Sequence, residues 1–282
     1  MTIHNTTWCP GCGNFPILDT AGRVIKEELK LKTSSYVIVS GIGQAAKIPH
    51  YFGNCNFFNG LHGRALPVAT GIKLANHKLK VFVFSGDGDL LAEGGNHFIH
   101  AIRRNIGITC VLHNNQVYGL TKGQASPTAD LDYTTKIQYM GVKAKPFYPL
   151  KAALVLGAGF VARTTAGNRG HMKDILKEAI DYNGFALVDI LQPCVTFNKK
   201  NTYKWYKEHT TILDDSYDPS DLESAMKIAG RWDHNIPLGI IYRKEFSSYE
   251  EKLPVLQKDP LVNQSFNAEG VKDTWVSLQH VP

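Results

Sequence analysis

Apolar residues recur along the first 200 positions in two alternating patterns. Over 17–29 they return every three or four positions, which is typical of a helix with one buried face. Over 36–39 the residues are apolar and mostly β-branched, which favours a buried strand, and a glycine turn follows at 41–43. The same patterns predict helices over 65–76, 90–104, 150–156 and 172–182, and strands over 81–84, 108–112, 160–163 and 185–191.

The order of these elements indicates the fold class. Strands without a polar face need cover on both sides, and helices of about a dozen residues between them supply it. We therefore predict an α/β domain over 1–200 with a doubly wound, mostly parallel sheet. In such a sheet, ligands bind beyond the carboxyl ends of the strands.

The pattern changes after residue 200. The chain becomes polar and is punctuated by proline, and only 236–242 has the composition of a further strand. We expect 201–282 to form an irregular arm that packs on the domain or on a partner subunit. Without such packing the tryptophans of this segment would be exposed without reason. They are Trp205, Trp232 and Trp275.

Composition narrows the class of protein. With 282 residues, 43 % of them apolar, the chain can bury a large core. Its net charge of +6 is dispersed along the sequence, so nucleic-acid binding is not expected. Apolar runs are too short for a membrane helix, and the start at residues 1–5 lacks the features of a signal peptide, so we expect a cytoplasmic protein. An odd number of cysteines, five, argues against a disulfide framework.

Polar residues with metal-binding chemistry follow two successive strands. Asp87 lies between Gly86 and Gly88 after the strand over 81–84, and Asn115 follows the strand over 108–112. A right-handed crossover returns the second strand beside the first, so the two side chains can meet at adjacent strand ends. Their oxygens suit Mg²⁺, which can keep diphosphate oxygens as its other ligands. The glycines let the backbone approach a phosphate closely.

This constellation resembles the binding motif for thiamine diphosphate (TPP), which is Gly-Asp-Gly followed after 25 to 30 residues by paired asparagines. Four further motifs extend the likeness through most of residues 5–200: they lie at 8–14 (WCPGCGN), 61–67 (LHGRALP), 94–105 (GGNHFIHAIRRN) and 118–124 (YGLTKGQ). Together they resemble the β subunit of 2-oxoacid:ferredoxin oxidoreductases. The resemblance implies a TPP-binding fold.

The resemblance also implies roles for individual residues. Magnesium would be held by Asp87, Asn115 and the carbonyl of Val117. The diphosphate would be lined by Gly88, Asp89, Gly119 and Leu120, with Ile42, Gly43 and His62 near the thiazolium or the phosphates. Lys47 and Lys122 would lie near the carboxylate of the substrate, with a solvated surface lysine as the alternative for each.

The activity implied is TPP-dependent oxidative decarboxylation of a 2-oxo acid to acyl-CoA and CO₂, with electrons passing through an iron–sulfur cluster to ferredoxin. Because the sequence holds one TPP-type half, an α subunit with the pyrimidine-binding domain is expected, and with it a second αβ unit. Two alternatives remain open. One is a non-redox TPP-dependent decarboxylase or acetolactate-synthase-like enzyme, and the other is a non-catalytic electron-transfer or assembly subunit.

The cysteines depart from the family pattern. That pattern places four of them around a [4Fe–4S] cluster, and Cys9, Cys12 and Cys194 match three. The fourth should follow Gly-Ile-Gly at 41–43, where this chain has Gln44. An amide is a poor substitute for a thiolate on iron. Three alternatives follow: Cys55 supplies the fourth ligand, the cluster has an irregular iron, or there is no cluster and the cysteines bind Zn²⁺ or nothing.

Overall fold

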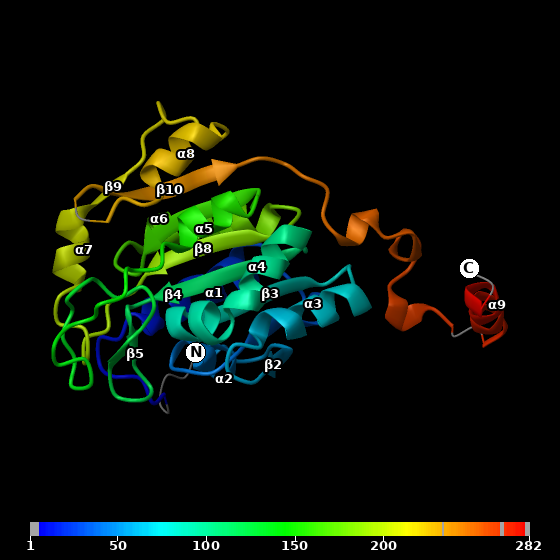
Figure 1. The fold of residues 1–282 in the computed structure, drawn as a ribbon, viewed down its shortest axis with the longest axis horizontal. Coiled ribbons are helices and arrows are strands. Elements are labelled where there is room, and N and C mark those ends of the chain that lie inside the picture. The colour runs from blue at the N-terminus through cyan, green and yellow to red at the C-terminus, as the bar shows by residue number, and fades with distance from the viewer. Residues whose placement is uncertain (1–5, 233, 266–267, 280–282) are drawn as a thin grey trace.

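Eight strands form one sheet, built mostly of parallel pairs (Figure 1). They are β1 (Tyr36–Ser40), β2 (Phe57–Asn59), β3 (Lys80–Gly86), β4 (Ile108–Asn114), β7 (Phe160–Thr165), β8 (Ala186–Leu191), β9 (Thr210–Ile212) and β10 (Ile236–Arg243). Their order across the sheet is β2-β1-β3-β4-β8-β7-β10-β9, and β10 runs antiparallel to β7. The computed structural model describes residues 6–232, 234–265 and 268–279.

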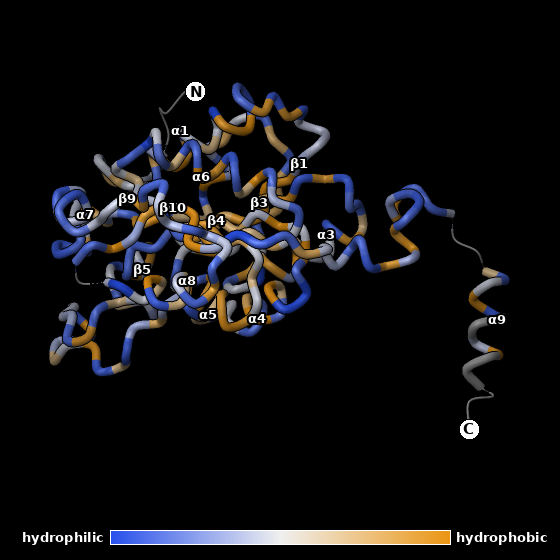
Figure 2. Tube along the Cα trace, turned by 90° about the horizontal axis from the view of Figure 1, so that it is seen from above, coloured by the Kyte–Doolittle hydropathy of each residue, from blue (hydrophilic) through white to orange (hydrophobic). Residues whose placement is uncertain are grey.

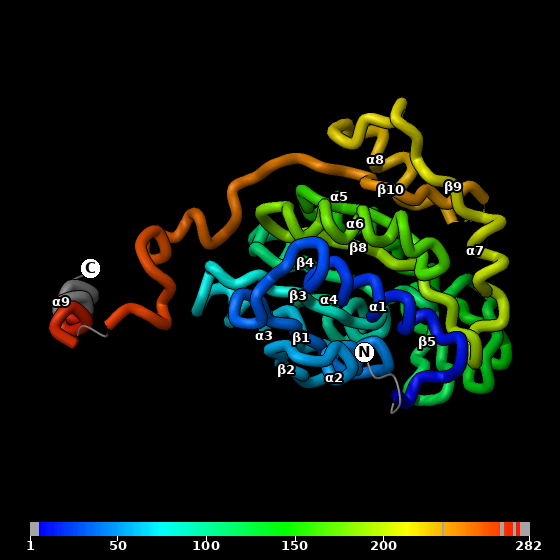
Figure 3. The backbone as a smooth tube through the Cα atoms, turned by 180° about the vertical axis from the view of Figure 1, so that it is seen from behind, coloured from blue at the N-terminus to red at the C-terminus, as the bar shows by residue number. Residues whose placement is uncertain are grey.

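Helices cover both faces of the sheet (Figures 1 and 3). The helices are α1 (Asn14–Arg23), α2 (Ile48–Tyr51), α3 (Ala65–Ala75), α4 (Gly95–Arg104), α5 (Pro149–Val155), α6 (Arg169–Asp181), α7 (Tyr203–His209), α8 (Leu222–Ile228) and α9 (Ala268–Gln279). Residues of α1, α2 and α6 share one apolar cluster with the sheet. Those of α3, α4, α5 and α8 share the cluster on the opposite face. The predicted doubly wound α/β fold is confirmed.

The central strand β3 shows why its sequence lacks a polar face. Val81 and Val83 belong to one cluster, while Phe82 and Phe84 belong to the other. Successive side chains of a strand point to opposite faces, so both sets are buried when helices cover both sides. These residues are at most 2 % exposed.

The helix predicted over 90–104 is in fact two segments. A π-helical turn over Gly88–Glu93 directly follows β3, and α4 begins only at Gly95. Wider turns of this kind are frequent at functional sites. Periodicity cannot separate the two segments, because both place their apolar residues against the same face of the sheet. A short hairpin of β5 (Val117–Tyr118) and β6 (Gln124–Ala125) also escapes prediction, since each strand has only two residues.

The segment after residue 200 is more regular than its sequence suggests. Strand β10, predicted over 236–242, completes the sheet together with β9, so the boundary predicted at residue 200 falls within one continuous sheet. Trp205 and Trp232 pack together with ring centroids 6.4 Å apart. After β10 the chain still packs on the body, where Ser248 is buried and Glu250 accepts a hydrogen bond from the Gly107 N–H at 3.1 Å. It then runs out to α9, which stands apart from the body (Figures 1, 2 and 3). There Trp275 is 65 % exposed.

Within the described ranges, no helix has the length and apolar character needed to cross a bilayer. The expectation about a signal peptide concerns residues 1–5, which lie outside the described residues. All five cysteines are free thiols.

Candidate active site

Asp87 lies at the end of β3, buried to 1 % exposure. Its Oδ2 accepts hydrogen bonds from the Gln116 backbone N–H at 2.8 Å and from the Ser126 hydroxyl at 2.6 Å, and the Thr128 hydroxyl lies 2.6 Å away. Its Oδ1 accepts one from the Gly88 N–H at 3.1 Å. All of these donors are uncharged, and burial raises the pKa of the carboxyl. A buried carboxylate held by neutral donors is a fitting ligand for a divalent cation.

Asn115 follows the neighbouring strand β4, as the crossover argument predicts. The two strands pair in parallel, with Gly86 opposite His113, so their ends meet. The Asn115 side-chain oxygen accepts a hydrogen bond from the Val117 N–H at 3.1 Å. The intervening Gln116 takes a left-handed φ of 64°, unusual for a residue other than glycine. This turn directs the Gln116 N–H at Asp87.

One cavity of about 80 Å³ gathers the residues predicted to bind TPP and Mg²⁺. It is lined by Ile42, Gly43, His62, Asp87, Gly88, Asp89, Asn115, Val117, Gly119 and Leu120. Glycine is needed at position 88, because a Cβ there would lie 2.3 Å from the Tyr118 ring. Glycine therefore lets the Tyr118 ring pack against the backbone at one wall of this cavity, which we call the cradle around Asp87.

Asp89 has a second task in this cavity. Asp89 is 3 % exposed, and its carboxylate holds the loops that follow β1 and β2. It accepts hydrogen bonds from the N–H groups of Ile42 at 3.0 Å and Gly63 at 2.7 Å, and its Oδ1 lies 2.7 Å from His62 Nδ1. A Cβ at Gly41 would lie 2.1 Å from the same carboxylate. Asp89 therefore positions Ile42 and His62 on the wall of the cavity.

Three of the cysteines line an adjoining cavity of about 240 Å³. Cys9 and Cys12 come from the segment before α1, and Cys194 comes from the loop after β8. Gln44, Asn115, Gly119 and Leu120 line both cavities. Burial raises the pKa of the Cys12 thiol to about 11. Among the described residues, no three His, Cys, Asp or Glu side chains converge on a single metal ion.

Three polar side chains around these thiols each have one atom without a partner among the described residues. Asn14, Gln44 and Gln192 line the same cavity, and each has a buried side-chain nitrogen or oxygen that makes no hydrogen bond within the described structure. The Gln192 amide nitrogen also lies 3.9 Å from the Cys12 sulfur. Buried polar atoms are normally satisfied, so this wall suits a bound group. An iron–sulfur cluster fits, because its thiolates bind different irons and need not converge on one point.

Cys55, one of the alternatives for a fourth ligand, lies elsewhere. Its sulfur is 3.8 Å from the Pro49 carbonyl oxygen, and its side chain packs against the apolar cluster that contains Tyr36 and Phe52. It does not line the cavity of the other cysteines. The remaining cysteine, Cys110, is fully buried in β4.

The two predicted substrate lysines line two other cavities, which share residues with the cradle. The Lys47 amine donates a hydrogen bond to the Thr7 hydroxyl at 2.6 Å, in a cavity that includes Ile42 and Gly43. Lys122 has a left-handed φ of 81° and lines the cysteine cavity. Both lysines therefore border the cavity around Asp87 without lining it.

Comparison with known proteins decides the family. Residues 35–190 match the thiamine pyrophosphate enzyme family, C-terminal TPP binding domain, and residues 194–258 match the C terminal part of the pyruvate ferredoxin oxidoreductase beta subunit. The subunit beta of a 2-oxoacid:ferredoxin oxidoreductase from Saccharolobus solfataricus is 43 % identical over 97 % of this chain and 95 % of its own length. This chain belongs to that family. The predicted family and the oxidoreductase class are confirmed.

Other relatives of this β subunit agree. The 2-oxoglutarate oxidoreductase subunit KorB of Mycobacterium tuberculosis is 47 % identical over 68 % of this chain and 51 % of its own length. A solved 2-oxoglutarate:ferredoxin oxidoreductase from Magnetococcus marinus, with 2-oxoglutarate, coenzyme A and succinyl-CoA bound, superposes with a TM-score of 0.89 at 36 % identity. The superposition covers 100 % of this chain and 94 % of that one. These relatives support the redox function and not the non-redox alternative.

A buried polar network behind the site is absent from the sequence prediction. Asn114 donates to Asp189 Oδ1 at 3.1 Å, and its own side-chain oxygen lies 2.9 Å from the Thr128 hydroxyl that also contacts Asp87. Asp189 in turn pairs with Arg163 Nε at 2.8 Å. The signal in the sequence is the charged residue Asp189 within an otherwise apolar strand. Its partner Arg163 lies on another strand, so the sequence alone does not identify the pair.

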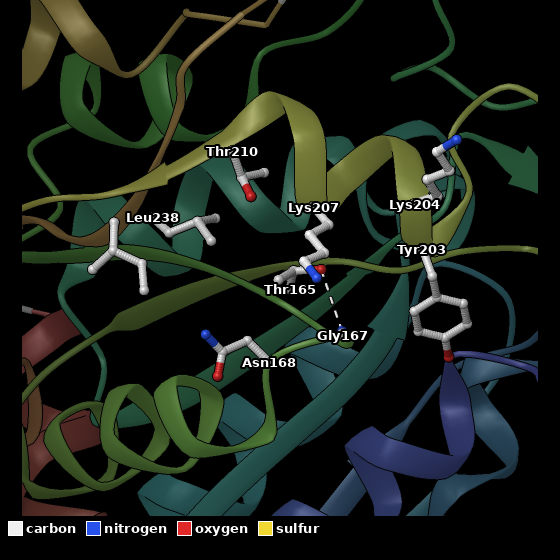
Figure 4. A pocket seen from close by; sticks show the side chains of 9 residues that line it. Thr165, Gly167, Asn168, Tyr203, Lys204, Lys207, Thr210 and Leu238 are labelled. Carbon is white, nitrogen blue, oxygen red and sulfur yellow. Dashed lines mark hydrogen bonds between the residues drawn. The ribbon is translucent and has the colours of Figure 1, made fainter.

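A separate cavity of about 560 Å³ lies at the carboxyl end of β7 (Figure 4). Its wall comes from the N-terminal end of α6, from α7 and from β9 and β10, and includes Thr165, Asn168, Tyr203, Lys204 and Lys207. None of the residues predicted from the sequence to bind cofactor or substrate lines it. The residues predicted to bind TPP and Mg²⁺ gather instead in the smaller cavity around Asp87.

Proposed function

We propose that this β subunit binds the diphosphate of TPP through Mg²⁺ and serves the oxidative decarboxylation of a 2-oxo acid to acyl-CoA and CO₂. Electrons would leave through a cluster held by Cys9, Cys12 and Cys194 to ferredoxin. The observation that carries the proposal is the buried Asp87 carboxylate, held by neutral donors beside Asn115 and the Gly88 cradle. Such a carboxylate suits Mg²⁺, and the cradle suits phosphate oxygens.

Each part of the cavity has a task in this function. TPP, when bound, supplies the electron sink that decarboxylation of a 2-oxo acid requires. Asp87, Asn115 and the Val117 carbonyl would hold the metal, while Gly88 and Gly119 let the backbone approach the phosphates. His62 Nδ1 faces the Asp89 carboxylate at 2.7 Å, which holds the ring in one orientation at the wall of the cavity.

The subunit needs partners to complete the site. As a β subunit, it contributes the diphosphate half, and we propose that an α subunit brings the pyrimidine-binding half. An exposed apolar loop supports this: Ile137, Tyr139 and Met140 are 64 %, 78 % and 70 % exposed. A hydrogen bond connects this loop to the wall of the cysteine cavity. The Tyr133 hydroxyl donates to the carbonyl of Phe197 at 2.9 Å, and Phe197 lines that cavity. Exposed apolar surface next to a site is typical of an interface.

Coenzyme A and ferredoxin complete the proposed set of partners. Coenzyme A is bound in the Magnetococcus marinus structure, and ferredoxin appears in the names of the relatives. We place the enzyme in the cytoplasm, because thiols that bind a cluster must remain reduced until the cluster is assembled.

The test is a reaction of the αβ complex, purified without oxygen and supplied with TPP and Mg²⁺. Pyruvate and 2-oxoglutarate are offered separately with coenzyme A and oxidised ferredoxin. The proposal expects reduction of ferredoxin that depends on the 2-oxo acid and on coenzyme A. Release of CO₂ without reduction of ferredoxin would contradict the redox function and leave TPP binding in place. Failure to bind TPP in calorimetry would contradict the cofactor assignment itself.

Lys122→Asn is expected to raise KM for the 2-oxo acid by about ten- to a hundredfold, because one charge-assisted hydrogen bond to the substrate carboxylate is lost. Asparagine tolerates the left-handed backbone of this position, so the loop should keep its shape. Steady-state kinetics measure KM, and calorimetry should find TPP affinity unchanged. The control is Lys136→Asn, which removes the charge of an exposed lysine. An unchanged KM would place Lys122 among solvated surface lysines.

A further inference from the structure

Gln44 lies at the meeting point of the two cavities. The residue lines the cavity of Cys9, Cys12 and Cys194 as well as the cradle around Asp87. Its backbone oxygen accepts a hydrogen bond from the Trp8 indole N–H at 2.9 Å. Trp8 is 6 % exposed and packs edge-to-face on two aromatic rings, so this bond fixes Gln44 next to the cysteine segment.

The side chain of Gln44 is incompletely bonded. Its Oε1 is shielded from solvent and accepts no hydrogen bond within the described structure. A buried amide oxygen without a donor is unfavourable, so such atoms normally face a partner. Asn14 and Gln192, which line the same cavity, each carry an unpaired atom as well. A group bound between the thiols would supply the missing contact.

No other cysteine takes this place. The Cys55 sulfur faces the Pro49 carbonyl, and Cys110 is enclosed between the helices and the sheet. Three cysteines and Gln44 therefore line one cavity. Sulfur suits iron of a cluster, whereas a neutral amide oxygen is a weak ligand that exchanges readily.

We infer that the Gln44 side-chain oxygen holds the fourth corner of a three-cysteine iron–sulfur site and leaves one iron exchangeable. This inference rests on the cluster in the proposed function. It assigns Gln44 a ligand role, and it predicts that one iron differs chemically from the other three.

The experiment compares iron release in the αβ complex, purified without oxygen. One equivalent of ferricyanide takes one electron from a [4Fe–4S]²⁺ core, one iron leaves as Fe²⁺, and a [3Fe–4S]⁺ core remains. A chelator measures the released Fe²⁺, and low-temperature electron paramagnetic resonance detects the three-iron core. The wild type is expected to release about one iron per chain. Gln44→Cys should slow this release by about tenfold or more, because a fourth thiolate binds that iron. Gln44→Ala should hasten it.

Controls keep the outcomes apart. Cys55→Ser should match the wild type, and loss of the cluster in this variant would overturn the inference in favour of Cys55. A four-iron cluster that resists ferricyanide in both the wild type and Gln44→Ala would overturn the role of Gln44 while leaving the proposed function intact. A wild-type complex that binds TPP but contains no iron would overturn the cluster and the inference together. Far-ultraviolet circular dichroism and the thermal unfolding of every variant report that its fold is intact.

Discussion

Asp87→Asn is expected to weaken Mg²⁺-dependent binding of TPP on the order of a hundredfold or more, because the metal loses its only charged protein ligand in the proposed set. The fold should survive. An asparagine oxygen can keep the hydrogen bonds from the Gln116 N–H and the Ser126 hydroxyl. The amide nitrogen would then face the Gly88 N–H, which leaves that donor unpaired, while burial makes the Asp87 charge unfavourable without a metal and raises its pKa. The two effects oppose each other, so the unfolding temperature without Mg²⁺ and TPP should change little.

Calorimetric titration of the αβ complex with TPP, with and without Mg²⁺, measures this effect. The matched control is Asp132→Asn, which removes an exposed carboxylate that pairs with Lys143 at 2.6 Å. A surface pair of this kind contributes little, so the control should bind TPP like the wild type. Wild-type affinity in Asp87→Asn would refute the assignment of the metal site.

Asp189→Ala is expected to destabilise this region of the sheet by about 3–5 kcal/mol, because it leaves the buried Arg163 guanidinium without its counter-charge. Both side chains are at most 1 % exposed. The loss is comparable with a large part of the stability of a typical domain. Amide hydrogen exchange of β7 and β8 in the complex measures it as a lower free energy of opening.

A double variant distinguishes the ion pair from simple packing. Arg163→Met with Asp189→Leu removes both charges and keeps apolar volume, so it should cost less than Asp189→Ala alone. In both variants Asn114 loses the Asp189 oxygen that accepts its hydrogen bond. Because Asn114 also contacts the Thr128 hydroxyl, which holds Asp87, a smaller effect on TPP affinity is expected in both. If the double variant opened as easily as Asp189→Ala, the uncompensated charge would not be the cause.

The motifs could indicate the candidate site because its proposed ligands directly follow strand ends. Asp87 and Asn115 stand immediately beyond neighbouring strands, and the crossover rule places such positions together. The residues that hold the Asp87 carboxylate could not be predicted in this way. Ser126 and Thr128 lie in a loop without periodicity, and only the folded chain brings their hydroxyls to Asp87.

The cysteines show the same division. The spacing of Cys9 and Cys12 and the match of Cys194 indicated a shared site, and the structure places them in one cavity. The sequence could not show whether Cys55 or Gln44 lies beside these three cysteines, because the direction of each side chain depends on packing. Trp8 fixes Gln44 beside the thiols, whereas Cys55 turns toward Pro49.

The sequence by itself determined the layers of the fold. Strands that are apolar on both faces and helices with one apolar face can bury their apolar surfaces in few other arrangements. It also determined the chemistry available at the strand ends. The tertiary structure alone decided that β9 and β10 complete the sheet, that Asp89 turns back to hold His62, and that Arg163 pairs with Asp189. These features depend on contacts between distant residues, and local pattern carries no information about which distant partner will satisfy a buried polar group.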